Sequence, residues 1–99
     1  MTPREDEISS KVVEILLKRL SPERVILFGS RGKGENNPRS DFDFAVFCPA
    51  PGISKEREVK EEIDKISGLY KVDIVYIKRV EEEFKEIIIS TGKVIYERK

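Results

Sequence analysis

The 99-residue sequence contains no histidine and a single cysteine, Cys48. Without histidine the chain cannot build a histidine-ligated metal site or a catalytic triad, and one cysteine excludes a disulfide framework and a cysteine-ligated zinc site. A carboxylate cluster is therefore the expected ligand set of any metal site. A lone cysteine after an apolar strand is usually a small buried hydrophobe, so we assign Cys48 no functional role and expect a reducing, cytoplasmic setting.

The chain also lacks a long apolar run and an excess of charge of either sign. No segment approaches the roughly 20 apolar residues of a membrane span, and residues 1–7 have no apolar core of a signal peptide, so we expect a soluble protein that is neither membrane-bound nor exported. The 19 Lys and Arg residues balance the 19 Asp and Glu residues. Generic nucleic-acid binding is therefore not expected. The length predicts one domain, residues 1–99.

Apolar residues and turn-forming residues alternate along the chain in a regular order. Thr2 and Pro3 suit the start of a helix, which ends before Ser21. Apolar runs predict strands and apolar residues at helical spacing predict helices. The expected elements are a helix to Leu20, strands at 25–28 and 41–47, a helix at 54–67, a strand at 71–77, a helix at 81–90 with Phe84, Ile87 and Ile88 facing inward, and a strand at 93–96. This α-β-β-α-β-α-β order indicates an α/β fold with helices on a mixed sheet of about four strands.

Two aspartates, Asp41 and Asp43, occupy alternate positions of the second predicted strand. Residues i and i+2 of a strand point to the same face, roughly 6–7 Å apart, so both carboxylates can bind the same one or two cations. Oxygen ligands of this kind suit Mg²⁺. The alternative is that both aspartates simply face solvent. Ala45 and Phe47 share their face, however, and aspartate is poorly suited to strands, which favours a site.

Asp73 repeats this pattern in the third predicted strand, where Val75 and Ile77 share its face. We expect this third carboxylate to face inward. Buried carboxylates are costly unless they are paired or bound to metal, and three clustered carboxylates repel one another. A metal ion would resolve both costs, so we predict that Asp41, Asp43 and Asp73 are metal ligands.

A loop at residues 29–40 follows the first strand and begins with Gly29 and Ser30. A tight turn after a buried strand exposes backbone amides to a phosphate, and the Ser30 hydroxyl adds a donor. A loop serine is by itself more often a cap or turn former. Gly29 and Ser30 become significant because of the number of residues that separate them from Asp41 and Asp43 in the sequence.

Gly29-Ser30, ten further residues and Asp41-Phe42-Asp43 resemble the Gly-Ser-(ten residues)-Asp-x-Asp motif of the DNA polymerase β nucleotidyltransferase superfamily. More narrowly, residues 28–34 and 40–46 are similar to the minimal nucleotidyltransferases. Asp73 lies where that family places its third carboxylate. The similarity extends over the whole chain, including the first helix and residues 87–96.

The resemblance implies a nucleotidyltransferase fold and transfer of AMP from ATP to a hydroxyl group. In such a site Asp41 and Asp43 would hold the Mg²⁺ that bridges the triphosphate. Asp73 would complete a second Mg²⁺ site and help to deprotonate the acceptor. Two ions roughly 3.5–4 Å apart can stabilise both the attacking and the leaving oxygen.

The phosphate-binding part of the site would come from the loop after the first strand. Gly29 and Ser30 would bind the β- and γ-phosphates, and Arg31, with Lys33, would offset the charge of the leaving pyrophosphate. A solvated surface position is nearly as good an interpretation of Arg31.

Members of this family are commonly paired with a small helical protein of the HEPN type in toxin–antitoxin modules. The resemblance therefore implies an antitoxin that adenylylates a tyrosine of a HEPN toxin encoded nearby. Two alternatives stay open: an antitoxin that acts by complex formation without transfer, and an adenylyltransferase for small molecules. The intact set of aspartates argues against the first, and the few residues left to enclose a small acceptor argue against the second.

Overall fold

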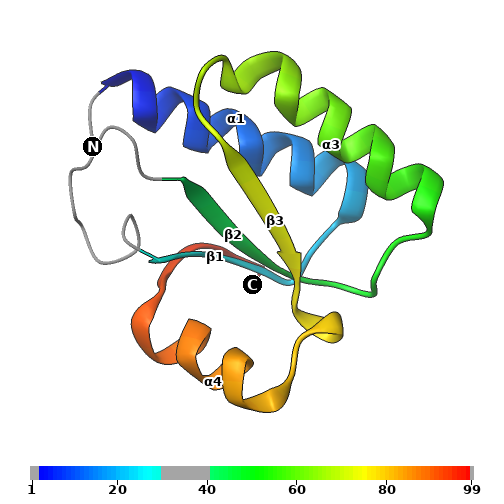
Figure 1. Ribbon diagram of the computed structural model, residues 1–99, viewed down its shortest axis with the longest axis vertical. Coiled ribbons are helices and arrows are strands. Elements are labelled where there is room, and N and C mark those ends of the chain that lie inside the picture. Colours follow the sequence, from blue (N-terminus) through cyan, green and yellow to red (C-terminus); the bar gives the residue numbers. More distant parts are fainter. Residues whose placement is uncertain (1–2, 30–40, 99) are drawn as a thin grey trace.

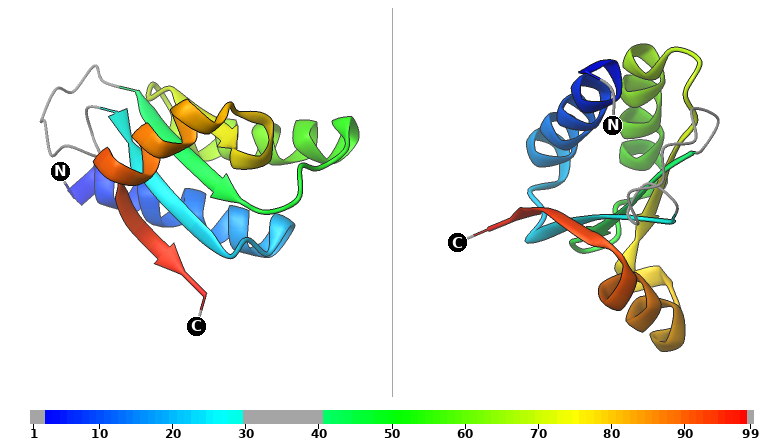
Figure 2. Two further views of the ribbon diagram at one scale, coloured as in Figure 1. Left: turned by 90° about the horizontal axis from the view of Figure 1, so that it is seen from below. Right: turned by 90° about the vertical axis from the view of Figure 1, so that its left-hand side faces the viewer.

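The computed structural model describes residues 3–29 and 41–98, which form a mixed sheet covered by helices on both faces (Figure 1). The elements are α1 (Pro3–Leu20), β1 (Arg24–Phe28), β2 (Phe42–Phe47), α3 (Ile53–Ser67), β3 (Val72–Tyr76), the short 3₁₀ helix η1 (Ile77–Arg79), α4 (Glu82–Thr91) and β4 (Lys93–Glu97). Helices α1 and α3 lie side by side on one face and α4 lies on the other (Figure 2). The predicted order of elements and the mixed sheet of four strands are confirmed.

The strand order is β3-β2-β1-β4. The pairing of these strands brings the end of one strand beside the starts of two others. β1 is antiparallel to both β2 and β4, whereas β2 and β3 are parallel. A parallel pair needs a crossover connection, which α3 supplies. The end of β1 therefore lies beside the starts of β2 and β3, at one end of the sheet.

Alternate residues of β2 enter two separate cores. Phe42, Phe44 and Val46 are fully buried in the larger core, beneath α1 and α3. Ala45 belongs to a smaller core beneath α4, together with Ile26, Ile77 and Ile88. Full burial of one large apolar side chain stabilises the fold by about 1.5–3 kcal/mol. The predicted alternation along this strand is confirmed.

Helices α1 and α3 pack through apolar stripes at helical spacing. Their fully buried members are Ile8, Val12, Leu16, Val59 and Ile63. Between the helices, the Arg19 Nε lies 2.8 Å from the Glu62 Oε2. Such a partly exposed ion pair contributes about 0–1 kcal/mol, so apolar packing dominates the contact. None of the helices within the described residues is long and apolar enough to cross a membrane.

The apolar stripe predicted for the last helix is wrong in part. Ile88 is fully buried, but Phe84 is 40% exposed and Ile87 is 56% exposed. This face of the sheet carries one helix of ten residues, so only the side chains that point straight at the sheet are enclosed. Phe84 still packs its ring edge-on against Phe28, with centroids 5.9 Å apart.

Two smaller expectations can be compared with the structure. The strand expected at 71–77 ends at Tyr76, because Ile77 begins η1. Cys48 is 4% exposed and belongs to the larger core, as expected.

Gly92 joins α4 to β4 at a point that has no room for a side chain. A Cβ there would lie 2.6 Å from the Ile88 carbonyl oxygen and would also press on the Ile26 Cγ2. We expect Gly92→Ala to lower the free energy of unfolding by about 1–3 kcal/mol, as overpacking does. Gly52→Ala is the matched control, because its Cβ would meet nothing within 4 Å and should change stability by only about 0.5 kcal/mol. Urea denaturation compares the two variants, and equal stabilities would show that the junction relaxes freely.

Candidate active site

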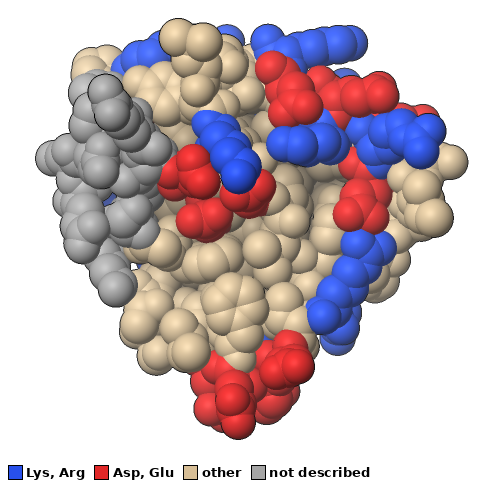
Figure 3. All heavy atoms as spheres, in the orientation of Figure 1, with Lys and Arg blue, Asp and Glu red and all other residues tan. Residues whose placement is uncertain are grey.

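The three predicted carboxylates meet at the end of the sheet where β1 ends and β2 and β3 begin. Asp43 and Asp73 are direct neighbours in the parallel register, on the face that α4 partly covers. Asp41 immediately precedes β2, one residue outside the strand in which it was predicted. We call Asp41, Asp43 and Asp73 the acidic cluster. Figure 3 shows acidic groups gathered around a basic side chain near the middle of this view.

The acidic cluster is less buried than predicted. The side chains of Asp41 and Asp73 are 42% and 43% exposed, and Asp43 has intermediate burial. The reason is their position: α4 covers Ile26 and Ala45 further along the strands, while the cluster lies at the sheet end. The carboxylates are therefore partly hydrated and accessible to a ligand.

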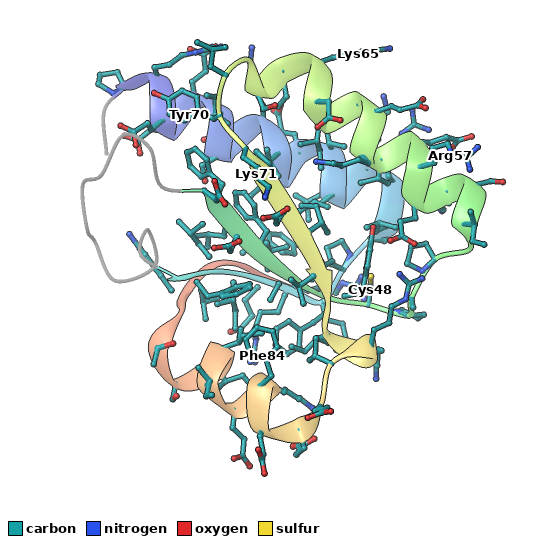
Figure 4. The ribbon with its side chains drawn as sticks, in the orientation of Figure 1. Cys48, Arg57, Lys65, Tyr70, Lys71 and Phe84 are labelled. Atoms are coloured by element: carbon teal, nitrogen blue, oxygen red, sulfur yellow. The ribbon has the colours of Figure 1, made fainter. Side chains whose placement is uncertain are left out.

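Lys71, labelled in Figure 4, contacts two members of the acidic cluster. Its Nζ is 3.9 Å from the Asp41 Oδ2 and 3.9 Å from the Asp73 Oδ2. Sequence reasoning missed this residue. Its place two residues before Asp73 was a possible signal, but an ordinary lysine at a strand start predicts no contact with Asp41, which is distant in sequence.

Asp43 has a perturbed acidity. Burial, then repulsion from Asp73 and Asp41, raises the pKa of Asp43 above its ordinary value of 3.8, while Lys71 acts in the opposite direction. A raised pKa means that the folded protein holds the proton more tightly than the unfolded chain does. The associated stability is present below pH 3.8 and is lost as pH rises through the folded pKa. Ionised Asp43 thus opposes folding at neutral pH when no cation is bound.

Gly29 borders the acidic cluster on the side of β1. It follows Phe28, which pairs with Asp43, and its φ of +73° lies in the left-handed region that favours glycine. A Cβ at this position would lie 2.7 Å from the Asp43 Oδ2. Glycine therefore lets the backbone at this position lie directly against the carboxylate. The other predicted residues of this loop, Ser30 and Arg31, lie outside the described residues.

The acidic cluster fits a magnesium ion by its chemistry and its charge. All its ligand atoms are carboxylate oxygens, which Mg²⁺ prefers, and the pKa of Asp43 is raised by burial and then by the neighbouring carboxylates of Asp73 and Asp41, whose negative charge a cation would offset. Within residues 3–29 and 41–98, no three acidic or cysteine side chains are already arranged as a metal site. Asp41 and Asp73 are instead disposed about the Lys71 ammonium.

A mixed sheet with carboxylates gathered at one end is the arrangement that the resemblance to the nucleotidyltransferases predicted. The family model described as "Polymerase beta, Nucleotidyltransferase" matches residues 10–99, and the chain belongs to this family. Within it, the chain is a minimal nucleotidyltransferase, as the resemblance predicted.

One relative in sequence and two solved structures of similar fold are compared with this chain. The chain is 31% identical over 90 residues to the Haemophilus influenzae protein named "Probable protein adenylyltransferase MntA". The alignment covers 88% of this chain and 78% of that protein. A crystal structure of a toxin–antitoxin pair with AMP-PNP has a TM-score of 0.77 at 20% identity, covering 91% of this chain and 73% of that one. The structure of a tri-AMPylated Shewanella oneidensis HEPN toxin with its MNT antitoxin gives 0.73 at 17% identity, covering 94% and 72%. Both structures share the fold of this chain.

Removal of one carboxylate should stabilise the protein when no metal is present. We expect Asp43→Asn to raise the Tm at pH 7 in EDTA, because it removes a charge that burial disfavours and that Asp73 and Asp41 repel. The gain should shrink as pH falls toward 3.8, where the wild-type side chain takes up a proton. Circular dichroism melts over this pH range measure both effects.

Asp64→Asn is the matched control for this experiment. Asp64 is exposed and forms an ion pair with Lys60, with Nζ and Oδ1 3.1 Å apart, so its replacement should give no gain. A lower Tm of Asp43→Asn than of wild type in EDTA would contradict the repulsion described for Asp43.

Proposed function

We propose that this chain is a cytoplasmic, single-domain, Mg²⁺-dependent adenylyltransferase that transfers AMP from ATP to a tyrosine of a helical HEPN-type partner. In this role it is the antitoxin of a toxin–antitoxin pair. The observation that carries the proposal is the acidic cluster at the sheet end, with the backbone of Gly29 directly against Asp43. The name of the Haemophilus influenzae relative and the AMPylated HEPN toxin bound to a protein of the same fold support the reaction and the partner.

ATP binding involves the acidic cluster and the residues that follow β1. Asp41 and Asp43 would hold one Mg²⁺ and Asp73 would help to hold a second, and such ions would supply positive charge to offset the triphosphate and the developing charge of the reaction. Gly29 and Ser30 bind the β- and γ-phosphates, and Arg31 offsets the charge of the pyrophosphate.

Asp73 acts on the side of the acceptor. The acceptor hydroxyl oxygen attacks the α-phosphorus of ATP, the bond from that phosphorus to the bridging oxygen breaks, and pyrophosphate leaves. A carboxylate oxygen of Asp73 takes the proton of the attacking hydroxyl. Because β3 is an edge strand and Asp73 is 43% exposed, a side chain presented by another protein can reach it.

Binding of Mg²⁺ and ATP should be visible as a gain in stability. A ligand that binds only the folded state stabilises it by about 2.7 kcal/mol at a hundredfold excess over Kd, so Mg²⁺ with ATP should raise the Tm of the wild type. The double variant Asp41→Asn/Asp43→Asn should show no such rise, whereas Asp64→Asn should keep it. A full shift in the double variant, measured by differential scanning fluorimetry, would remove the metal-site assignment.

Transfer should require both a partner and Asp73. Labelled ATP, Mg²⁺ and the helical protein encoded beside this chain should give label on that partner, and mass spectrometry should locate added AMP on a tyrosine. Asp73→Asn should slow labelling by about 100-fold or more, as loss of a general base does, while it keeps the Tm shift with ATP. A partner in which the modified tyrosine is replaced by phenylalanine is the control.

The same experiment separates the alternatives. A tight complex that never acquires label would favour an antitoxin that acts by binding alone. Efficient modification of a small amino or hydroxyl compound by the isolated chain would favour a small-molecule enzyme. Wild-type labelling rates in Asp73→Asn would show that this carboxylate is structural.

A further inference from the structure

The backbone of Lys71 is fixed by a hydrogen bond from β2, and the preceding residue, Tyr70, packs against the same strand. The Phe42 amide donates a hydrogen bond of 2.9 Å to the Lys71 carbonyl oxygen, at the start of the β2–β3 pair. The Tyr70 ring packs edge-on against Phe42, with centroids 5.7 Å apart. Contacts with Phe42, the first residue of β2, therefore fix the point just before β3 from which the Lys71 side chain extends.

From that point the ammonium reaches the acidic cluster. The Lys71 Nζ lies 3.9 Å from a carboxylate oxygen of Asp41 and equally far from one of Asp73. Among the ion pairs of the described residues, these two are the ones that involve the cluster; the others join residues elsewhere on the surface. Lys71 is thus the cation that faces the carboxylates within the part of the chain that the structure describes.

The geometry suits a temporary partner better than a permanent one. Both contacts are long for ion pairs, and the Lys71 side chain is 66% exposed, so the ammonium can leave the carboxylates without crossing a packed region. Three clustered carboxylates nevertheless need positive charge nearby, because like charges at short range oppose the folded state. A metal ion would take the same two side chains as ligands.

We propose that Lys71 is a built-in counter-ion, which holds Asp41 and Asp73 in place while no metal is bound and releases them to the metal ion. It is a positioning residue, since it acts through the two carboxylates. The release to metal rests on the proposed Mg²⁺-dependent function, whereas the counter-ion role in the empty site does not.

The test compares Lys71→Gln, Lys71→Arg and the control Lys65→Gln in the full chain. Lys65→Gln removes the same charge from α3, at a side chain that projects away from the sheet (Figure 4). In EDTA, Lys71→Gln should have a lower Tm than Lys65→Gln, and Lys71→Arg should remain near wild type because it keeps the charge. The deficit of Lys71→Gln should disappear in saturating Mg²⁺ and should shrink when Asp73→Asn is added, because one of the two partners of the ammonium is then neutral.

Metal affinity provides the second readout, without nucleotide and without activity. Mn²⁺ titrations followed by electron paramagnetic resonance should give tighter binding to Lys71→Gln than to Lys65→Gln, by roughly threefold to tenfold, because the metal no longer displaces an ammonium. Lys71→Arg should bind Mn²⁺ like wild type.

Two results would overturn the proposal. One is an EDTA melt in which Lys71→Gln is as stable as Lys65→Gln; the other is weaker Mn²⁺ binding by Lys71→Gln than by wild type. Failure of the proposed function looks different: no variant, including wild type, would bind Mn²⁺, while a deficit of Lys71→Gln that Asp73→Asn reduces would still support the counter-ion role.

Discussion

The parallel pairing of β2 with β3 is the constraint on which the site depends. It fixes Asp43 beside Asp73, and the antiparallel pairing of β1 with β2 sets Phe28 opposite Asp43. Gly29, the next residue, is thereby brought against the Asp43 carboxylate. These relations are held by backbone hydrogen bonds, so no rotation of side chains can separate the strands that carry the charges.

The strands that carry the acidic cluster also carry buried apolar side chains, which stabilise the fold against the repulsion among the carboxylates. On β2, Phe42 and Phe44 are fully buried on the face opposite Asp43. Their burial holds the strand in a position where Asp43, Asp73 and Asp41 repel one another. Placement of the carboxylates at the sheet end limits the cost, because partial hydration screens them. Local conflict of this kind is expected where a site must bind a cation.

Most of the fold could be predicted from the periodicity of the sequence. The alternation along residues 41–47 correctly separated Phe42, Phe44 and Val46 from Ala45, because side-chain direction in a strand is local. The exposure of Phe84 and Ile87 could not be predicted, because it depends on how much of α4 the sheet covers. The partial exposure of the acidic cluster has the same origin, since it is set by where α4 ends on the sheet.

For the site, the sequence by itself determined the family, because the spacing of Gly29, Asp41 and Asp43 matches the nucleotidyltransferase motif, and it proposed which residues carry the chemistry. Only the tertiary structure decided that Lys71 lies between Asp41 and Asp73 and that a Cβ on Gly29 would meet Asp43. The spacing of residues along the chain identifies a motif within one stretch of sequence. Contacts between segments depend on strand register and on the crossover through α3, which are fixed by the packing of the whole sheet.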